Sequence, residues 1–159
     1  MPDLLFRLPL PDADATARLG QRMAQLVRPG DVLLLEGQIG AGKTHFARSL
    51  IQTRLAALDR SEDIPSPTFT LLQVYDAAPE IWHADLYRLT HPDEAIELGL
   101  EEAFDTAICL IEWPDRLADL APRKALTLRF ELTDAGASRC VSFLGDVDWA
   151  ERLTDLRDA

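Results

Sequence analysis

The residues best suited to chemistry stand in one glycine-rich stretch, Gly37 to Thr44, which reads G-Q-I-G-A-G-K-T. It matches the G-x-x-x-x-G-K-[ST] pattern, whose glycines let backbone N–H groups turn inward around a phosphate. Lys43 would place a positive charge at the β- and γ-phosphates, and Thr44 would offer its hydroxyl to Mg²⁺. We therefore predict a phosphate-binding loop, although the loop alone does not name the nucleotide. The predicted phosphate and cofactor contacts are Gly37, Gly40, Ala41, Gly42, Lys43 and Thr44.

The segments on either side of this loop fit the same role. Residues 32–35 form a short apolar run that favours a buried strand, and residues 44–58 carry apolar side chains at helical spacing. A helix that begins at the loop adds the positive end of its dipole to the phosphate site. Strand, loop and helix thus follow one another in the order that the motif requires.

A phosphate loop also needs an acidic residue for Mg²⁺ and a group that positions the attacking water. Glu112 directly follows the apolar run 107–111, at the end of a predicted parallel strand, where open α/β sheets bind their ligands. Asp85 ends a second strand-like run, and Thr68 lies in the loop S-P-T, where a switch-like segment could reach the γ-phosphate. These three residues are candidates for metal binding and catalysis.

Each candidate also has a purely structural interpretation. Glu112 could cap a helix, Asp85 could pair with Arg88, and Thr68 could simply begin a strand. Trp113 fits core packing as well as it fits a position beside the nucleotide. We interpret His83 and His91 as structural or solvated residues, and Cys109 and Cys140 as buried thiols, since their spacing fits no C-x-x-C site.

Length and composition narrow the class of protein. The 159 residues, 47% of them hydrophobic, suffice for one well-buried core, so we expect a single domain over residues 1–159. No apolar run approaches the ~20 residues that cross a bilayer, which predicts a cytoplasmic protein without membrane association. The net charge of −11 argues against direct binding to nucleic acid, because such binding depends on Lys and Arg.

The remaining segments predict a mixed α/β protein. We expect parallel strands at 32–35 and 107–111. Two further pairs of strand-like runs favour antiparallel hairpins, one formed by 69–75 and 80–86 and the other by 126–132 and 140–144. The further elements we expect are a strand at 6–8 ended by Pro9 and Pro11, a helix from Asp12 or Asp14 to about 27, a short helix at 92–98 that stops or kinks at Gly99, and a helix at 147–156.

Read together, several motifs resemble one bacterial family. The ordered segments are GQIGAGKT (37–44), SPTFTL (66–71), HADLYRL (83–89), ELGLEE (97–102) and ICLIEWPDRL (108–117), and the set closely resembles the TsaE family, also called YjeE. The resemblance runs from about residue 8 to residue 117. It implies a P-loop NTPase-like three-layer α/β/α fold whose central sheet is mixed and mainly parallel.

The resemblance further implies a small ATPase that uses ATP and Mg²⁺. It would act with the partner proteins TsaB and TsaD to install threonylcarbamoyl on the adenosine next to the anticodon of ANN-decoding tRNAs. ATP turnover would reset the partner complex between cycles, and tRNA would be contacted only indirectly, through the partners.

By matching position, the resemblance gives roles to individual residues. Thr44 and Glu112 would be Mg²⁺ ligands, Lys43 the phosphate contact, and Asp85 and Thr68 catalytic or switch residues. Trp113 would lie near the nucleotide, and the segment that includes Asp14 would approach the adenine. Arg139 lies beyond the matched stretch, where the chain agrees with the family only in pattern, so a nucleotide contact from Arg139 is a hypothesis and not a matched role. The chain departs from the pattern at His45, where members often carry threonine, and we expect this side chain to face away from the phosphates.

Two other functions remain open at this point. A small-molecule P-loop kinase would account for the loop and for Glu112 with Arg116, but the chain has no arginine-rich segment for a lid. A nucleotide-gated binding module with incidental hydrolysis is the second alternative. A GTPase is disfavoured because the chain has no N-K-x-D motif to read guanine.

Overall fold

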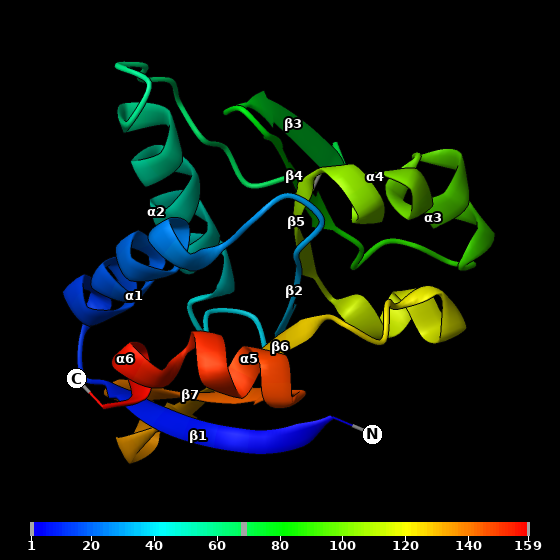
Figure 1. Ribbon diagram of the computed structural model, residues 1–159. Helices are drawn as coiled ribbons and strands as arrows, with labels where there is room; N and C mark the ends of the chain where they lie inside the picture. Colours follow the sequence, from blue (N-terminus) through cyan, green and yellow to red (C-terminus); the bar gives the residue numbers. More distant parts are fainter. Residues whose placement is uncertain (1, 68–69, 159) are drawn as a thin grey trace.

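The chain folds around a seven-stranded sheet with the strand order β1-β7-β6-β2-β5-β4-β3 (Figure 1). The structure is a computed structural model that describes residues 2–67 and 70–158. The four central strands β6, β2, β5 and β4 are parallel, and antiparallel strands extend the sheet at both edges. The predicted mixed sheet with antiparallel hairpins is therefore confirmed. The strands are β1 (Asp3–Leu10), β2 (Val32–Glu36), β3 (Leu72–Asp76), β4 (Glu80–Asp85), β5 (Ile108–Glu112), β6 (Leu126–Thr133) and β7 (Ser138–Gly145).

Helices cover both faces of the sheet (Figure 1). Helices α1 (Ala13–Leu26) and α2 (Lys43–Ala56) lie on one side, and α3 (Asp93–Glu97) and α4 (Leu100–Thr106) lie on the other. The remaining elements are the 3₁₀ helices η1 (Pro114–Leu120) and η2 (Asp134–Gly136) and the C-terminal helices α5 (Val147–Arg152) and α6 (Thr154–Arg157). The arrangement is the three-layer α/β/α architecture expected from the sequence.

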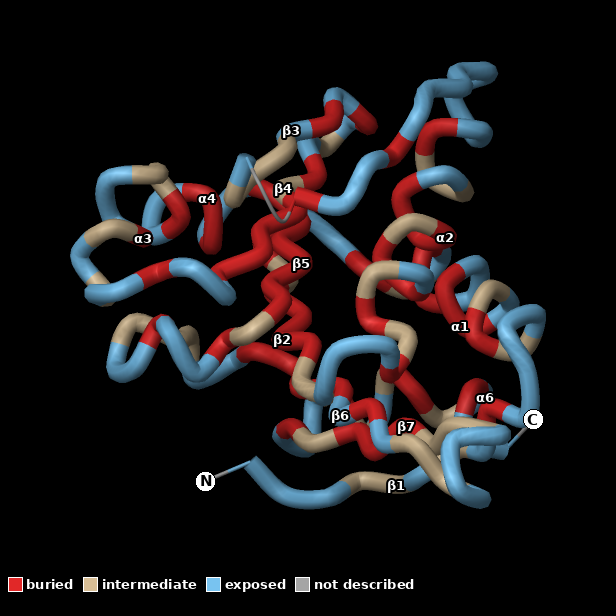
Figure 2. Tube along the Cα trace, turned by 180° about the vertical axis from the view of Figure 1, so that it is seen from behind, coloured by how far each residue is buried: buried red, intermediate tan, exposed pale blue. Residues whose placement is uncertain are grey.

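The central strand β2 shows why three layers form. Its side chains alternate between two hydrophobic clusters: Leu33 and Leu35 belong to the cluster that includes α1 and α2, whereas Val32 and Leu34 belong to the cluster that includes α4. A strand buried on both faces needs an apolar side chain at every position, which the run at 32–35 supplies. Figure 2 shows this as nearly continuous burial along β2 and β5.

Helices α1 and α2 pack closely at Gly20, and this contact places the start of α1 beside the phosphate loop. A Cβ atom at Gly20 would lie 2.8 Å from the carbonyl oxygen of Phe46 and 2.8 Å from Ser49 Cβ, so only glycine fits there. Asp12 fixes the start of α1, because its Oδ1 accepts a hydrogen bond from Ala15 N over 2.8 Å.

The structure corrects several boundaries. Strand β1 is longer than residues 6–8 and includes Pro9, which is tolerated because β1 is an edge strand whose outer side needs no hydrogen bonds. The short helix α3 ends before Gly99 as predicted, but a further helix, α4, begins directly after the left-handed backbone of Gly99 (φ +87°). The C-terminal helix divides at Leu153. Cys109 is buried as expected, but Cys140 is partly exposed.

Within residues 2–67 and 70–158, no helix is long and apolar enough to cross a membrane. Thr68 lies outside the described residues, so its proposed role stays a prediction.

Candidate functional site

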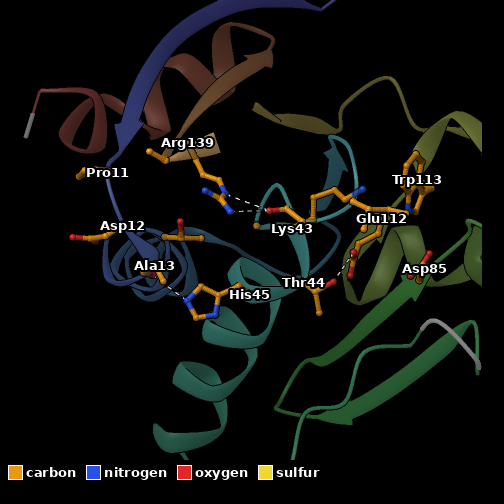
Figure 3. Close-up of a pocket in the computed structure, with 15 residues that line it drawn as sticks. Pro11, Asp12, Ala13, Lys43, Thr44, His45, Asp85, Glu112, Trp113 and Arg139 are labelled. Carbon is orange, nitrogen blue, oxygen red and sulfur yellow. Dashed lines mark hydrogen bonds between the residues drawn. The ribbon is translucent and has the colours of Figure 1, made fainter. Parts of the chain in front are cut away.

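A cavity of about 560 Å³ opens where the phosphate loop meets the carboxyl ends of the parallel strands β4 and β5 (Figure 3). Its walls come from the β1–α1 connection, the phosphate loop, the start of α2, the ends of β4 and β5, and the start of β7. The structure thus brings together residues that are far apart in the sequence. The lining residues are Pro11, Asp12, Ala13, Thr16, Ile39, Gly40, Gly42, Lys43, Thr44, His45, Asp85, Glu112, Trp113, Ala137 and Arg139.

Two glycines give the phosphate loop its shape. Gly37 has a φ of +141°, and a Cβ atom there would lie 2.6 Å from the carbonyl oxygen of Phe130 on β6. Gly42 has a φ of +110° and caps α2, which therefore begins at Lys43. A side chain at either position would be strained, so the pattern of glycines reflects backbone geometry. Gly37 and Ala41 shape the loop from outside the lining of the cavity.

Lys43 lies inside the cavity with only 5% of its surface exposed. Its Nζ donates to the carbonyl oxygen of Gly37 and lies 3.7 Å from the centroid of the Trp113 ring. Burial lowers the pKa of Lys43, and the carboxylates of Glu112, Asp85 and Asp115 partly offset that shift. The ammonium group is therefore partly desolvated, and the nearby carboxylates favour its charged form, which is the form that binds phosphate.

Glu112 joins the loop to the end of β5. Thr44 Oγ1 donates to Glu112 Oε1 over 2.8 Å, and His83 Nε2 lies 2.7 Å from Glu112 Oε2. Glu112 is only 2% exposed. Thr44 and Glu112, predicted as a pair of metal ligands, are therefore in direct contact at the mouth of the loop (Figure 3).

Asp85 lies beside Glu112 because β4 and β5 are parallel and their register pairs these two residues. Its side chain is largely buried, with 5% exposed, and lines the same cavity. The Oδ1 atom accepts a hydrogen bond from Tyr87 N over 3.0 Å, which fixes the carboxylate at the turn after β4. The site therefore presents two carboxylates at the ends of adjacent strands.

Trp113 closes this side of the cavity. Its backbone adopts a left-handed conformation (φ +60°) at the start of η1, a strained geometry for a residue with a bulky side chain. The ring packs against Tyr87, with centroids 4.9 Å apart, and against Lys43. The sequence left Trp113 open between core packing and a site role, and the structure places it in the lining of the cavity.

The opposite wall is formed mainly by the β1–α1 connection and by Arg139. Arg139 Nε and Nη2 donate to the carbonyl oxygen of Gly40 over 3.3 and 3.1 Å, so the guanidinium lies against the tip of the phosphate loop. Asp12, rather than Asp14, lines the cavity; the structure does not bring Asp14 into the lining. Arg139 thus lines the cavity from the start of β7.

His45 lines the cavity on the side of α1. Its Nε2 lies 3.0 Å from the carbonyl oxygen of Ala13 (Figure 3). The close packing of α1 against α2 brings this carbonyl within reach, a contact that local sequence does not reveal.

The donor set fits Mg²⁺ that arrives with a phosphate ligand. The hydroxyl of Thr44 and the carboxylates of Glu112 and Asp85 are oxygen donors, and Mg²⁺ is typically held by one or two carboxylates together with substrate phosphates. Among the residues that the structure describes, no group of three or more His, Cys, Asp or Glu side chains could hold a metal by itself. The arrangement therefore suits a metal–nucleotide complex better than an independent metal site.

Sequence reasoning did not assign His83 to the site. The residue is fully buried behind Glu112 rather than in the lining of the cavity. One signal could have found it: His83 is two residues before Asp85 on the same strand, so the two side chains share a face of the sheet.

Comparison with known proteins decides the family. The model of the family described as "Threonylcarbamoyl adenosine biosynthesis protein TsaE" matches residues 10–141. The chain belongs to the TsaE family. The residues that match this family of threonylcarbamoyladenosine biosynthesis proteins include every residue that lines the cavity, from Pro11 to Arg139.

Individual TsaE relatives agree with the family model. The tRNA threonylcarbamoyladenosine biosynthesis protein TsaE of Rickettsia felis is 38% identical over 132 residues, which cover 82% of this chain and 75% of the relative. The TsaE protein of Bacillus subtilis is 35% identical over 117 residues, or 72% of this chain and 70% of the relative. The crystal structure of Bacillus subtilis YdiB superposes with a TM-score of 0.77 at 26% identity and covers 99% of this chain and 96% of that one.

Proposed function

We propose that this TsaE-family chain is a Mg²⁺-dependent ATPase that supports threonylcarbamoyl modification of the adenosine next to the anticodon in ANN-decoding tRNAs. The observation that carries the proposal is the meeting of Lys43, Thr44, Asp85 and Glu112 in one cavity beside a complete phosphate loop. A cation, a hydroxyl and two carboxylates in that arrangement are what phosphoryl transfer from a metal–nucleotide complex requires.

The residues of the loop would bind and orient the phosphates of ATP. Lys43 would exchange its present neutral partners, the Gly37 carbonyl and the Trp113 ring, for phosphate oxygens. Thr44 and Glu112 would hold Mg²⁺, which when bound offsets negative charge on the phosphates. Asp85, fixed by its hydrogen bond from Tyr87 N, would orient the attacking water or accept its proton.

The opposite wall would receive the nucleoside. Pro11, Ala13, Ile39 and Ala137 offer apolar surface to a base, and Arg139 adds a positive charge near the loop. Asp14 follows Ala13 in the first turn of α1 but does not line the cavity, so a contact between Asp14 and adenine would require this segment to shift. The described residues provide this wall without a guanine-reading N-K-x-D motif, which favours ATP over GTP.

The charge of the chain supports a function that depends on partner proteins. The net charge of −11 disfavours direct contact with tRNA, so TsaB and TsaD would bind the tRNA and this chain would reset their complex between cycles. Thr68 remains a proposed switch residue for that coupling. A role on tRNA implies work in the cytoplasm.

The kinase alternative is less well supported. The kinase hypothesis pairs Glu112 with Arg116, but Arg116 does not line the cavity. Its Nη1 atom lies 3.9 Å from Oδ2 of Asp115. A nucleotide-gated module with incidental hydrolysis is separated from the proposal by the following experiment.

Purified chain, TsaB, TsaD and an ANN-decoding tRNA should be combined with the substrates of the modification under single and multiple turnover. We expect repeated cycles only with the wild-type chain, whereas Glu112→Gln should permit at most one cycle. Repeated cycles with a Glu112→Gln chain that binds but does not hydrolyse ATP would show that hydrolysis is incidental. Failure of the wild-type chain to stimulate modification would contradict the proposed function.

A further inference from the structure

Both oxygens of the Glu112 carboxylate are held by donors from other elements. Thr44 Oγ1 on α2 contacts Oε1 over 2.8 Å, and His83 Nε2 on β4 contacts Oε2 over 2.7 Å. The imidazole is 0% exposed and does not line the cavity, so it approaches the carboxylate from the protein interior. His83 therefore touches the proposed metal ligand without facing the proposed substrate.

The direction of this hydrogen bond follows from the chemistry of its partners. A glutamate that binds Mg²⁺ does so as the carboxylate, whose oxygens only accept, so Nε2 of His83 is the donor in this hydrogen bond. Among the described residues, the other ring nitrogen, Nδ1, is buried and has no hydrogen-bond partner. Of the two ring nitrogens, Nε2 therefore bonds to Glu112 and Nδ1 has no partner among the described residues.

This imbalance argues against a role in packing alone. A leucine or phenylalanine would fill the space between β4 and its neighbours without leaving a buried nitrogen unpaired. The Nε2–Oε2 bond is the one polar contact of the imidazole that the described residues provide. Because a glutamate side chain has several rotatable bonds, a donor at one oxygen restricts where the other oxygen points.

We infer that His83 is a positioning residue that orients Glu112 so that Oε1 faces Thr44 and the incoming Mg²⁺. The inference rests on the proposed function, since it assumes that Glu112 binds the metal of a Mg²⁺–ATP complex. It assigns His83 no contact with nucleotide or metal. Residues that orient metal ligands in this way typically change metal affinity 10- to 100-fold when replaced.

Three substitutions separate positioning from packing. The amide nitrogen of His83→Gln is as many bonds from the backbone as Nε2 and can still donate to Glu112. The amide nitrogen of His83→Asn corresponds to Nδ1 and falls short of the carboxylate. His83→Leu fills space without any donor. The glutamine and asparagine variants are matched, because both bury an amide and only one reaches Glu112.

The decisive measurement is the affinity for ATP by calorimetry, first in EDTA and then with saturating Mg²⁺, on the full chain. We expect the Mg²⁺-dependent gain in affinity to persist in wild type and His83→Gln and to fall about 10- to 100-fold in His83→Asn and His83→Leu. Affinity in EDTA should be equal in all four proteins, since the loop that binds phosphate is untouched. Thermal unfolding verifies that each variant is folded.

Several results would overturn the inference. A full Mg²⁺-dependent gain in His83→Asn, or no difference between the asparagine and glutamine variants, would show that the Nε2 bond does not position Glu112. An equal loss of affinity in EDTA would show a general structural defect. If His83→Leu does not fold, the glutamine–asparagine comparison decides alone. If the wild-type chain binds ATP with the same affinity in EDTA and in Mg²⁺, the proposed function is contradicted, and the inference with it.

Discussion

Thr44 Oγ1 and Glu112 Oε1 lie 2.8 Å apart although their residues are separated by 68 positions in the sequence. The contact joins the first turn of α2, which follows the phosphate loop, to the carboxyl end of the central strand β5. Because β2 and β5 are paired in parallel, both elements emerge at the same edge of the sheet. The topology itself therefore assembles the proposed metal site.

Replacement of Glu112 tests this contact. Glu112→Gln should reduce Mg²⁺-dependent phosphate release from ATP about 100-fold or more, because an amide replaces the anionic ligand while the volume is kept. Binding of ATP in EDTA should be retained. Glu102→Gln on α4 is the matched control, since Glu102 is exposed and outside the cavity. Unchanged phosphate release in Glu112→Gln would exclude Glu112 as the metal ligand.

Trp113 should report nucleotide binding. The Lys43 ammonium lies 3.7 Å from its ring centroid, and a bound phosphate would draw this charge away. We expect the tryptophan emission to change when ATP and Mg²⁺ are added, and this change to disappear in Trp113→Phe. Trp82 and Trp149 serve as the internal background. A full signal in Trp113→Phe would contradict the assignment of Trp113 to the site.

Gly37→Ala should destabilise the protein through a collision with β6. The added Cβ atom would meet the Phe130 carbonyl oxygen at 2.6 Å in a backbone with φ +141°, at a cost of about 2 kcal/mol or more in the free energy of unfolding. Gly136→Ala is the control, because its φ is also positive (+91°) but no atom lies within 4 Å. Urea unfolding should show the larger loss for Gly37→Ala. Equal losses of unfolding free energy in the two variants would mean that the collision with Phe130 does not add to the cost of the substitution at Gly37.

The two cysteines should differ in reactivity. Burial raises the pKa of the Cys109 thiol to about 12 from its ordinary value of 9.0, so at pH 8 the reactive thiolate is nearly absent. The folded protein should take up one iodoacetamide, at the partly exposed Cys140, and none in Cys140→Ser. Mass spectrometry after brief labelling measures this. Labelling of Cys109 at pH 8 in the folded Cys140→Ser variant would contradict its burial.

The sequence predicted those parts of the fold that rest on local patterns. The run at 32–35, the glycine spacing of the loop and Glu112 at the end of an apolar run each contain the information that places them. The full length of β1 was missed because Pro9 is unfavourable in a strand unless its outer edge is unpaired, a fact of the assembled sheet. Likewise, only the structure shows that Gly99 separates α3 from α4.

The site residues, like the fold, were predictable where a local motif places them. Lys43, Thr44, Asp85, Glu112 and Trp113 follow from motif and strand-end positions, and all line one cavity. The contacts of His83 with Glu112 and of His45 with Ala13 depend on strand register and helix packing across 29 and 32 positions. The spacing of His83 and Asp85 places both side chains on one face of β4, but the pairing of β4 with β5 and the packing of α1 on α2 are not local patterns, so these two contacts required the structure.

Phosphate release from ATP by the purified chain, measured with Mg²⁺ and with EDTA, alone and with TsaB and TsaD, tests the proposed activity most directly. We predict Mg²⁺-dependent release that the partners increase, slower release from GTP, and none above background in Lys43→Ala, which lacks the phosphate-binding cation. Equal release by Lys43→Ala and wild type, or no release and no ATP binding by the wild-type chain even with both partners, would contradict the account.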